Sequence, residues 1–197
     1  KALEGKKYGT WNDPVELAMI KSLIEKQGGN YNKIELVPNS DSNSITPLEN
    51  GVFDAAWIYY AWDGKLAESM NLETNFFYLR DFDKKLDYYS PVIIANNDYL
   101  KNNKEEAQKV LRAIKKGYVY AIEHPEEAAD ILIKNAPELK EKRDFVVASQ
   151  KYISQQYASN KEHWGEFDAE RWNAFYHWVN DNKIIEKPLA DNTGFSN

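Results

Sequence analysis

The sequence contains no cysteine, so it can form neither a disulfide framework nor a thiolate metal site. It also lacks any apolar run that approaches the roughly 20 residues of a membrane-spanning helix. The hydrophobic content of 43% is ordinary for a globular protein, and 197 residues are enough for one domain or two small ones with a proper core.

Positive charge is in short supply. The chain has 25 Lys and Arg against 31 Asp and Glu, which gives a formal net charge of −6. Nucleic-acid-binding proteins present a basic face to the phosphate backbone, so this balance argues against a nucleic-acid partner. No signal peptide is visible, but the chain starts at Lys1 without Met, and we expect a processed or cut product.

Aromatic residues make up 14% of the chain, and Tyr and Trp lead the count. In the segment 51–62, a Gly turn precedes a short apolar strand that ends in large rings with polar tips. The segment 10–17 ends another expected strand in a similar way. Rings with an OH or NH tend to lie where one side is packed and the other meets a partner. The two corners predict a pocket for a flat, polar small molecule.

The first half of the chain alternates between strand and helix patterns. The expected strands are Lys6–Thr10, Lys33–Val37, Val52–Tyr60 and Phe76–Leu79. Between them we expect a helix that starts at Pro14 and stops at Gly28, and shorter helices over Ile45–Asn50 and Asp63–Met70, with a polar turn over Asn39–Ser44. This rhythm predicts a parallel sheet with ligands at the carboxyl ends of its strands.

The second half is mostly helical. Apolar stripes predict a helix that ends before His124–Pro125, a second from Pro125, a third around Phe145–Ile153 and a last one capped by Asp168. Only Val92–Ala95 has a strand pattern, and a single strand cannot satisfy its own backbone. We therefore expect its sheet partners upstream of Lys1, and a domain boundary near Tyr88–Pro91.

Several sequence blocks, in this order, resemble one known family. They are Gly5–Trp11, Pro14–Ala18, Asn50–Trp57, Tyr59–Gly64, Tyr89–Asn97, Ala121–Ala129 and Arg171–Tyr176. The chain resembles, over essentially its whole length, the substrate-binding proteins of ABC importers that are related to enzymes of thiamine pyrimidine synthesis. The nearest branch is the binders of formylaminopyrimidine and other thiamine precursors.

The resemblance implies an α/β fold of the type II periplasmic-binding-protein class, which closes on its ligand like a hinge. Residues 1–88 would be one complete α/β lobe, and residues 89–197 the mostly helical C-terminal part of the other. The N-terminal part of that other lobe, with the family's Trp-Asn and His-Thr-Gly type ligand motif, is not in this sequence. Independent binding by this chain is therefore expected to be weak.

The resemblance further implies an extracytoplasmic solute-binding component of an ABC importer, which holds a thiamine pyrimidine precursor in a cleft between its lobes. The implied partners are a small pyrimidine ligand and an ABC permease. Membrane attachment would come only through a lipid anchor outside this chain, and no cofactor or catalytic residue is implied.

The candidate ligand-binding residues lie at the two aromatic corners. Glu16 is either a carboxylate placed against a helix N-terminus or a partner for the exocyclic amine of an aminopyrimidine. Trp11, Tyr59, Tyr60 and Trp62 are the candidates for stacking on a flat ring, whereas Trp57 is expected in the core. Asn12 could supply a polar contact, although it and Asp13 are also suited to helix capping.

Catalysis finds little support in the sequence. His124, His163 and His177 show no metal-ligand spacing, and Asp81 and Asp83 are expected in a solvated turn. Other functions remain open: a binder of alkanesulfonate, taurine or a flavin precursor on the same scaffold, an effector-sensing domain of a transcription regulator, or a relative of the pyrimidine-synthesis enzymes. Those enzymes are marked by a cysteine-rich motif, which this cysteine-free chain lacks.

Overall fold

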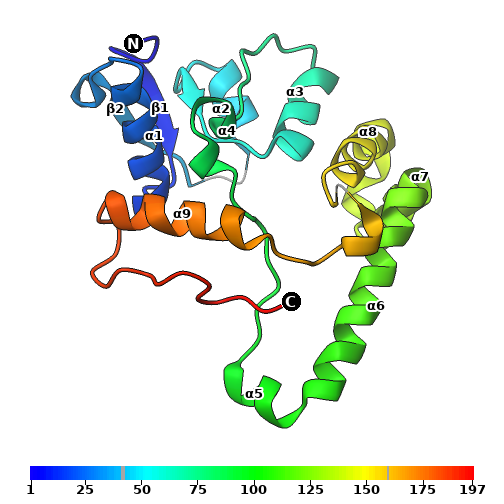
Figure 1. Ribbon diagram of the computed structural model, residues 1–197. Coiled ribbons are helices and arrows are strands. Elements are labelled where there is room, and N and C mark those ends of the chain that lie inside the picture. The colour runs from blue at the N-terminus through cyan, green and yellow to red at the C-terminus, as the bar shows by residue number, and fades with distance from the viewer. Residues whose placement is uncertain (41–42, 159) are drawn as a thin grey trace. The chain divides into compact units, whose positions relative to one another are not determined.

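The computed structural model describes residues 1–40, 43–158 and 160–197, which form two compact units (Figure 1). Unit 1 comprises Lys1–Tyr88 and Phe167–Ser196, and unit 2 comprises Tyr89–Glu166 with the last residue, Asn197. The first boundary between the units lies between Tyr88 and Tyr89, and Phe167–Ser196 belong to the same compact unit as Lys1–Tyr88. The assignment of these segments to two lobes stays a prediction.

A three-stranded parallel sheet forms the centre of unit 1, as predicted. Its strand order is β2 (Glu35–Pro38), β1 (Lys7–Thr10), β3 (Ala55–Ala56), and Tyr8 of β1 lies opposite Leu36 on one side and Ala55 on the other. Because β1 contributes only four residues and β3 pairs with two of them, the predicted strand Val52–Tyr60 is far too long. The chain leaves the sheet after Ala56, which brings Tyr59 into a corner.

Helix α1 (Pro14–Lys26) supplies the largest part of the core of unit 1. The Asp13 carboxylate caps its start by accepting hydrogen bonds from the amides of Val15 and Glu16 at 2.9 and 3.0 Å, as the Asp-Pro pair predicted. Its apolar face buries Met19 completely. Trp57 packs against the same cluster, which confirms its predicted place in the core.

Helix α9 (Ala169–Asp181) completes that core from the far end of the sequence. Its Trp178 and Val179 lie in one buried cluster with Met19, Leu23 and Leu86. Figure 1 shows α9, in orange, lying beside the end of α1. The predicted cap is confirmed, since the Asp168 carboxylate accepts from the Arg171 amide at 2.8 Å.

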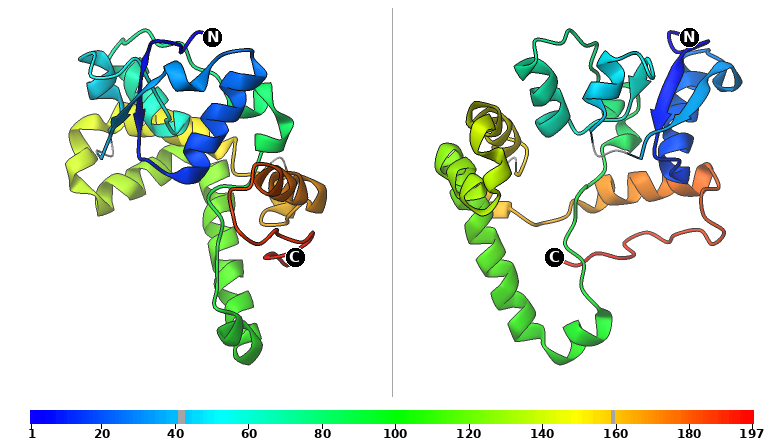
Figure 2. Two further views of the ribbon diagram at one scale, coloured as in Figure 1. Left: turned by 90° about the vertical axis from the view of Figure 1, so that its left-hand side faces the viewer. Right: turned by 180° about the vertical axis from the view of Figure 1, so that it is seen from behind.

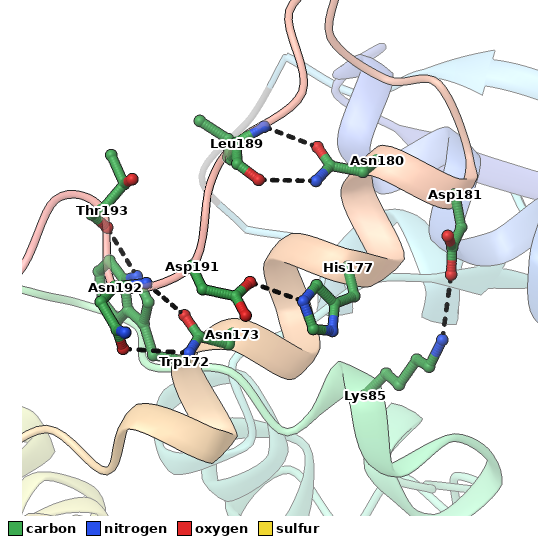
Figure 3. A network of polar contacts seen from close by, with 10 residues as sticks. All are labelled: Lys85, Trp172, Asn173, His177, Asn180, Asp181, Leu189, Asp191, Asn192 and Thr193. Carbon is green, nitrogen blue, oxygen red and sulfur yellow. Dashed lines mark hydrogen bonds and ion pairs between the residues drawn. The ribbon is translucent and has the colours of Figure 1, made fainter.

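The tail after α9 runs back along this helix (Figure 3). Asn180 and Leu189 exchange two hydrogen bonds of 2.9 Å each, between a side-chain amide and a main-chain amide. One turn earlier on the helix His177 contacts Asp191 at 2.7 Å, and another turn earlier Asn173 and Asn192 form a second reciprocal pair. The polar face of α9 thus gives an extended segment the partners that a strand would otherwise provide.

The remaining elements of unit 1 are short. They are η1 (Tyr31–Lys33), α2 (Ile45–Glu49), the π-helical turn η2 (Tyr60–Gly64), α3 (Lys65–Ser69), α4 (Leu79–Phe82) and η3 (Lys84–Leu86). The predicted helix over Ile45–Asn50 is confirmed as α2, and the one over Asp63–Met70 is confirmed as α3 with a later start. The polar turn predicted over Asn39–Ser44 lies partly outside the described residues.

The predicted strand Phe76–Leu79 is wrong. Residues 76–78 are irregular, and Leu79 begins α4. The aromatic residues that suggested a strand contact other rings instead: Phe76 lies 4.1 Å from the Tyr60 ring and 4.7 Å from the Tyr78 ring, centroid to centroid. β-propensity largely reflects a fit to a half-buried surface, and here a ring cluster provides that surface without a strand.

Unit 2 is helical. Its elements are α5 (Asn97–Asn102), α6 (Lys104–Glu123), α7 (Pro125–Asn135), η4 (Pro137–Lys142), α8 (Arg143–Ser154) and η5 (Lys161–His163). Figures 1 and 2 show α7 and α8 packed together near the C-terminal end of α6, with α5 at the opposite end. The four predicted helices of the second half are therefore confirmed. In the described part of the chain no helix is long and apolar enough to cross a membrane.

The predicted strand Val92–Ala95 does not form. These residues are exposed, and the Ile94 side chain reaches 87% exposure. Among the described residues of unit 2 there is no strand with which this segment could pair. An apolar, extended sequence without a partner strand remains irregular.

Candidate functional site

Trp11 and Tyr59 follow two neighbouring strands of the sheet, β1 and β3. The carboxyl ends of parallel strands meet at one edge, so the chain brings both side chains to that edge. Their rings lie nearly parallel, with an interplanar angle of 17° and 6.2 Å between centroids. Both are accessible, at 42% for Trp11 and 60% for Tyr59. We call Trp11 and Tyr59 the ring pair.

Glu16 lies beneath the first corner and is only 4% exposed. One carboxylate oxygen, Oε1, accepts from the Tyr8 hydroxyl at 2.9 Å. The other, Oε2, accepts from the Thr10 hydroxyl at 2.8 Å and from the Trp11 amide at 3.2 Å. Three hydrogen-bond donors of the chain therefore stabilise this carboxylate. Without them, its burial would destabilise the folded state strongly. Its predicted contact with a ligand stays a prediction, and the structure adds a role within the corner.

Tyr8 and Thr10 were not identified from the sequence as partners of Glu16. They are two residues apart on β1 and therefore point to the same face of the sheet, which was the available signal. Burial raises the pKa of the Tyr8 phenol, and the neighbouring Glu16 carboxylate raises it further. Tyr8 thus keeps its proton and acts as a donor.

Asn12 stands at the top of this corner in a left-handed conformation, with φ of 62°. Its amide donates to the Thr10 hydroxyl oxygen at 2.8 Å, which links it to the Glu16 cluster. Asparagine adopts this conformation more readily than most residues. Asn12 is exposed and follows Trp11 of the ring pair in the sequence. Its predicted polar contact with a ligand stays a prediction.

Asp63 plays the matching part at the second corner, and sequence reasoning assigned it no role. The residue is 7% exposed, and its carboxylate accepts from the Tyr59 amide at 2.9 Å, while its own amide donates to the Tyr59 carbonyl at 2.9 Å. Burial raises the pKa of Asp63, and the hydrogen bond from Tyr59 partly offsets this effect. The sequence signal was an Asp four residues after an aromatic corner residue, a spacing that a tight turn brings together.

Tyr60 points into a different cluster. Its ring contacts Phe76 and Gly64, and its hydroxyl donates to Glu68 at 2.6 Å. The structure therefore unites Trp11, Tyr59 and Glu16 but places the Tyr60 ring among the residues after α3. Trp62 lies in the π-helical turn and is 38% exposed. Roles for Tyr60 and Trp62 in ligand binding stay predictions.

The described residues offer no metal centre. Within 1–40, 43–158 and 160–197, no three His, Asp or Glu side chains are close enough to hold a metal ion. The chemistry that this edge provides is that of an exposed aromatic surface above two buried carboxylates. Such a surface suits a planar molecule with hydrogen-bond donors.

The fold, a parallel α/β unit with aromatic corners at its carboxyl edge and a helical unit, is of the type II periplasmic-binding-protein class, as the family matched by this chain indicates. The chain belongs to the family described as NMT1/THI5 like, whose model matches residues 1–128. It is also similar to the formylaminopyrimidine-binding protein of Halalkalibacterium halodurans, with 22% identity over 185 residues. These residues are 93% of this chain and 56% of that protein, so the chain spans little more than half of the relative. The family predicted from the sequence is confirmed.

Proposed function

We propose that this chain is part of a solute-binding protein that takes up a pyrimidine precursor of thiamine for an ABC importer, without catalysing a reaction on it. The observation that carries the proposal is the ring pair. Two large aromatic side chains lie nearly parallel and accessible at the carboxyl edge of the sheet. The relationship to a formylaminopyrimidine-binding protein supports the choice of a heterocycle.

The spacing of the ring pair is suited to stacking. Carbon atoms in contact lie about 3.5 Å apart, so a flat ring between two others needs roughly 7 Å. The centroids of Trp11 and Tyr59 are 6.2 Å apart, and a small opening of the pair would admit a pyrimidine. A pyrimidine could equally extend the stack on an exposed face. Either arrangement contributes on the order of 1 kcal/mol beyond the burial of apolar surface.

The charges beneath the ring pair favour a ligand with donors. In the part of the chain that the structure describes, neither Glu16 nor Asp63 forms an ion pair with a Lys or Arg. Two buried negative charges repel a sulfonate and attract an amino group or a protonated ring nitrogen. Of the Glu16 oxygens, Oε1 accepts one hydrogen bond and retains one acceptor position, whereas Oε2 already accepts two. Oε1 is therefore the atom proposed to meet the exocyclic amine, with Asn12, Tyr60 and Trp62 as further contacts.

The wider setting of the proposal follows from the family. We infer an extracytoplasmic protein of two lobes, in which residues 1–88 are one lobe and residues 89–197 the C-terminal part of the other. A lipid anchor outside this chain would hold it at the membrane, and a permease would receive the ligand. Closure of two lobes around a ligand changes the shape that the permease meets.

Isothermal titration of the full-length protein with formylaminopyrimidine, hydroxymethylpyrimidine and taurine tests the proposal. We expect binding of a pyrimidine but not of taurine, and a loss of about tenfold in affinity when Trp11→Leu or Tyr59→Leu removes one stacking ring. Phe77→Leu is the matched control, because Phe77 is an equally exposed aromatic residue, at 49%, outside the two corners. Binding of taurine alone, or equal affinities for all three variants, would contradict the proposal.

A further inference from the structure

The orientation of the two rings in the ring pair must be fixed by some other part of the structure. Both side chains are accessible, at 42% and 60%, so burial in a core does not fix them. A stacking contact adds only about 0.5–1.5 kcal/mol, which is comparable with the entropy lost when a side chain is immobilised. The main chain at the two corners must therefore set where the rings lie.

The main-chain amide of each ring residue donates to a buried carboxylate. The Trp11 amide donates to Glu16 Oε2 at 3.2 Å, and the Tyr59 amide donates to Asp63 Oδ2 at 2.9 Å. The two carboxylates belong to the helical turns that follow the two corners, and the residues Glu16 and Asp63 are 4% and 7% exposed. The same device thus occurs twice, once after β1 and once after β3.

Buried carboxylates are costly, which makes this repetition informative. A carboxylate removed from water must be compensated by hydrogen bonds or by a cation, and the described residues place no Lys or Arg in an ion pair with Glu16 or Asp63. The cost of burying the two carboxylates is compensated by hydrogen-bond donors in and next to the corners. A charged acceptor holds an amide more tightly than a neutral one does, so each carboxylate stiffens the corner in front of it.

We propose that Glu16 and Asp63 are positioning residues, which hold the ring pair in register for stacking by fixing the main-chain amides of Trp11 and Tyr59. The proposal rests on the proposed function for its significance, because the ring pair matters only if a ligand stacks on it. Its geometric content is independent of any ligand. Asp63 is the sharper test, because in the described part of the chain its carboxylate accepts from the Tyr59 amide and from its own amide, whereas Glu16 also holds the side chains of Tyr8 and Thr10.

Fluorine NMR of the protein labelled with 5-fluorotryptophan measures the ring pair directly without ligand. The resonance of Trp11 is assigned by its loss in Trp11→Phe, and Tyr59→Leu gives the shift produced by removing the neighbouring ring. We expect Asp63→Ala to move the Trp11 resonance by at least half of that shift. Asp63→Asn should restore the original position, because its amide oxygen can still accept from the Tyr59 amide.

The matched control is Asp83→Ala. Asp83 also accepts from a main-chain amide, that of Lys85 at 3.1 Å, but at the start of η3 and not at an aromatic corner. We expect this variant to lose a cap and leave the Trp11 resonance in place. If Asp63→Ala does not fold, Asp63→Glu keeps the charge and displaces the acceptor by one methylene, and it should produce the same shift. An unchanged Trp11 resonance in a folded Asp63→Ala or Asp63→Glu variant would overturn the proposal.

Titration of the same variants with formylaminopyrimidine separates the two proposals. A moved Trp11 resonance with about tenfold weaker affinity supports both. A moved resonance with unchanged affinity supports the positioning role and contradicts the function proposed for the ring pair. An unmoved resonance overturns the positioning role, whatever the affinity.

Discussion

Asn12 shows how one residue fixes the corner after β1. Its φ of 62° lies in the left-handed region, where a β-branched residue is strained by roughly 1–2 kcal/mol. We expect Asn12→Val to lower the free energy of unfolding by about this amount, because the corner must distort or bear the strain. Asn12→Gly should change the stability by a few tenths of a kcal/mol only, because glycine adopts positive φ freely. Urea denaturation of both variants measures the difference, and equal stabilities would contradict this explanation.

Tyr60 provides a prediction that depends on pH. The hydrogen bond to Glu68, followed by partial burial, raises the pKa of the Tyr60 phenol from 10 to about 12. Carbon-13 NMR of the phenol carbon, assigned with Tyr60→Phe, should show titration near this value. In Glu68→Gln the pKa should fall toward 10, because the negatively charged acceptor is gone.

The same shift links this residue to stability. Between pH 10 and 12 the unfolded chain releases the Tyr60 proton while the folded chain retains it, so this contribution is present below about pH 10 and is lost as the pH approaches about 12. Glu127→Gln serves as a control, since Glu127 accepts from Tyr120 instead. A Tyr60 pKa that is the same in all variants would show that Glu68 is not the cause.

The geometry of the candidate site was predictable from sequence where the signal was chemical and local, although its ligand contacts stay predictions. The aromatic corners and the Asp13 cap followed from residue type and position, and the structure places Trp11 and Tyr59 together at neighbouring strand ends. Asp63 was missed because its function depends on a π-helical turn that no propensity predicts. Whether Tyr60 joins Tyr59 or turns away depends on the ring of Phe76, sixteen residues later, which no local pattern contains.

Two glycines illustrate opposite roles within strands and helices. A Cβ at Gly9 in β1 would lie 2.6 Å from the Phe53 ring, which is only 2% exposed, whereas a Cβ at Gly117 in α6 meets nothing within 4 Å. We expect Gly9→Ala to destabilise the protein by about 1–3 kcal/mol, because the buried ring has nowhere to move. Gly117→Ala should stabilise it by roughly 0.5–1 kcal/mol through helix propensity. Denaturant unfolding checks both, and changes of the same sign would refute the comparison.

The helices of this chain were easier to predict than its strands for a physical reason. α6 and α7 satisfy their backbones within their own sequence, and caps such as His124–Pro125 mark their ends. A strand exists only if another segment pairs with it. Ala55–Ala56 pairs with β1 and forms β3, whereas Phe76–Leu79 and Val92–Ala95 pair with no strand in the part of the chain that the structure describes, although their residues suit a strand equally well.

At the scale of the whole molecule, we predict that the core of unit 1 depends on α9. Trp178 and Val179 complete a core whose other buried members lie in residues 1–88, and the Arg171 side chain also donates to the Asp87 carbonyl at 2.6 Å. We expect a fragment of residues 1–88 to lack cooperative unfolding, because Met19 and Leu86 would be exposed. Adding a peptide of residues 167–196 should restore the transition in calorimetry.

The same peptide with Trp178→Ala provides the control. Removing a buried Trp lowers the free energy of unfolding by about 3–5 kcal/mol, and we expect this loss to exceed the stability of a core assembled from two separate fragments. That peptide should fail to restore the transition. Cooperative unfolding of residues 1–88 alone, with no effect of either peptide, would show that α9 is dispensable for this core.

The contribution of α9 to unit 1 also shows what sequence patterns leave out. Its apolar stripe predicted an amphipathic helix correctly, but the stripe does not state which surface it covers. Lys85 and Asp181, which form an ion pair at 3.1 Å, are 96 residues apart. Contacts at such separation follow from the assembly of all elements, and the sequence pattern of residues 89–197 does not contain them.

The return of α9 has a consequence for biosynthesis. A ribosome that adds about 5–20 residues per second needs roughly 5–20 s to travel from residue 88 to residue 181. Throughout that interval the apolar face of α1 lacks its contact with Trp178, although all three strands of the sheet have already been synthesised. The nascent polypeptide therefore exposes this apolar face until α9 has been synthesised, and it is prone to aggregation during that interval.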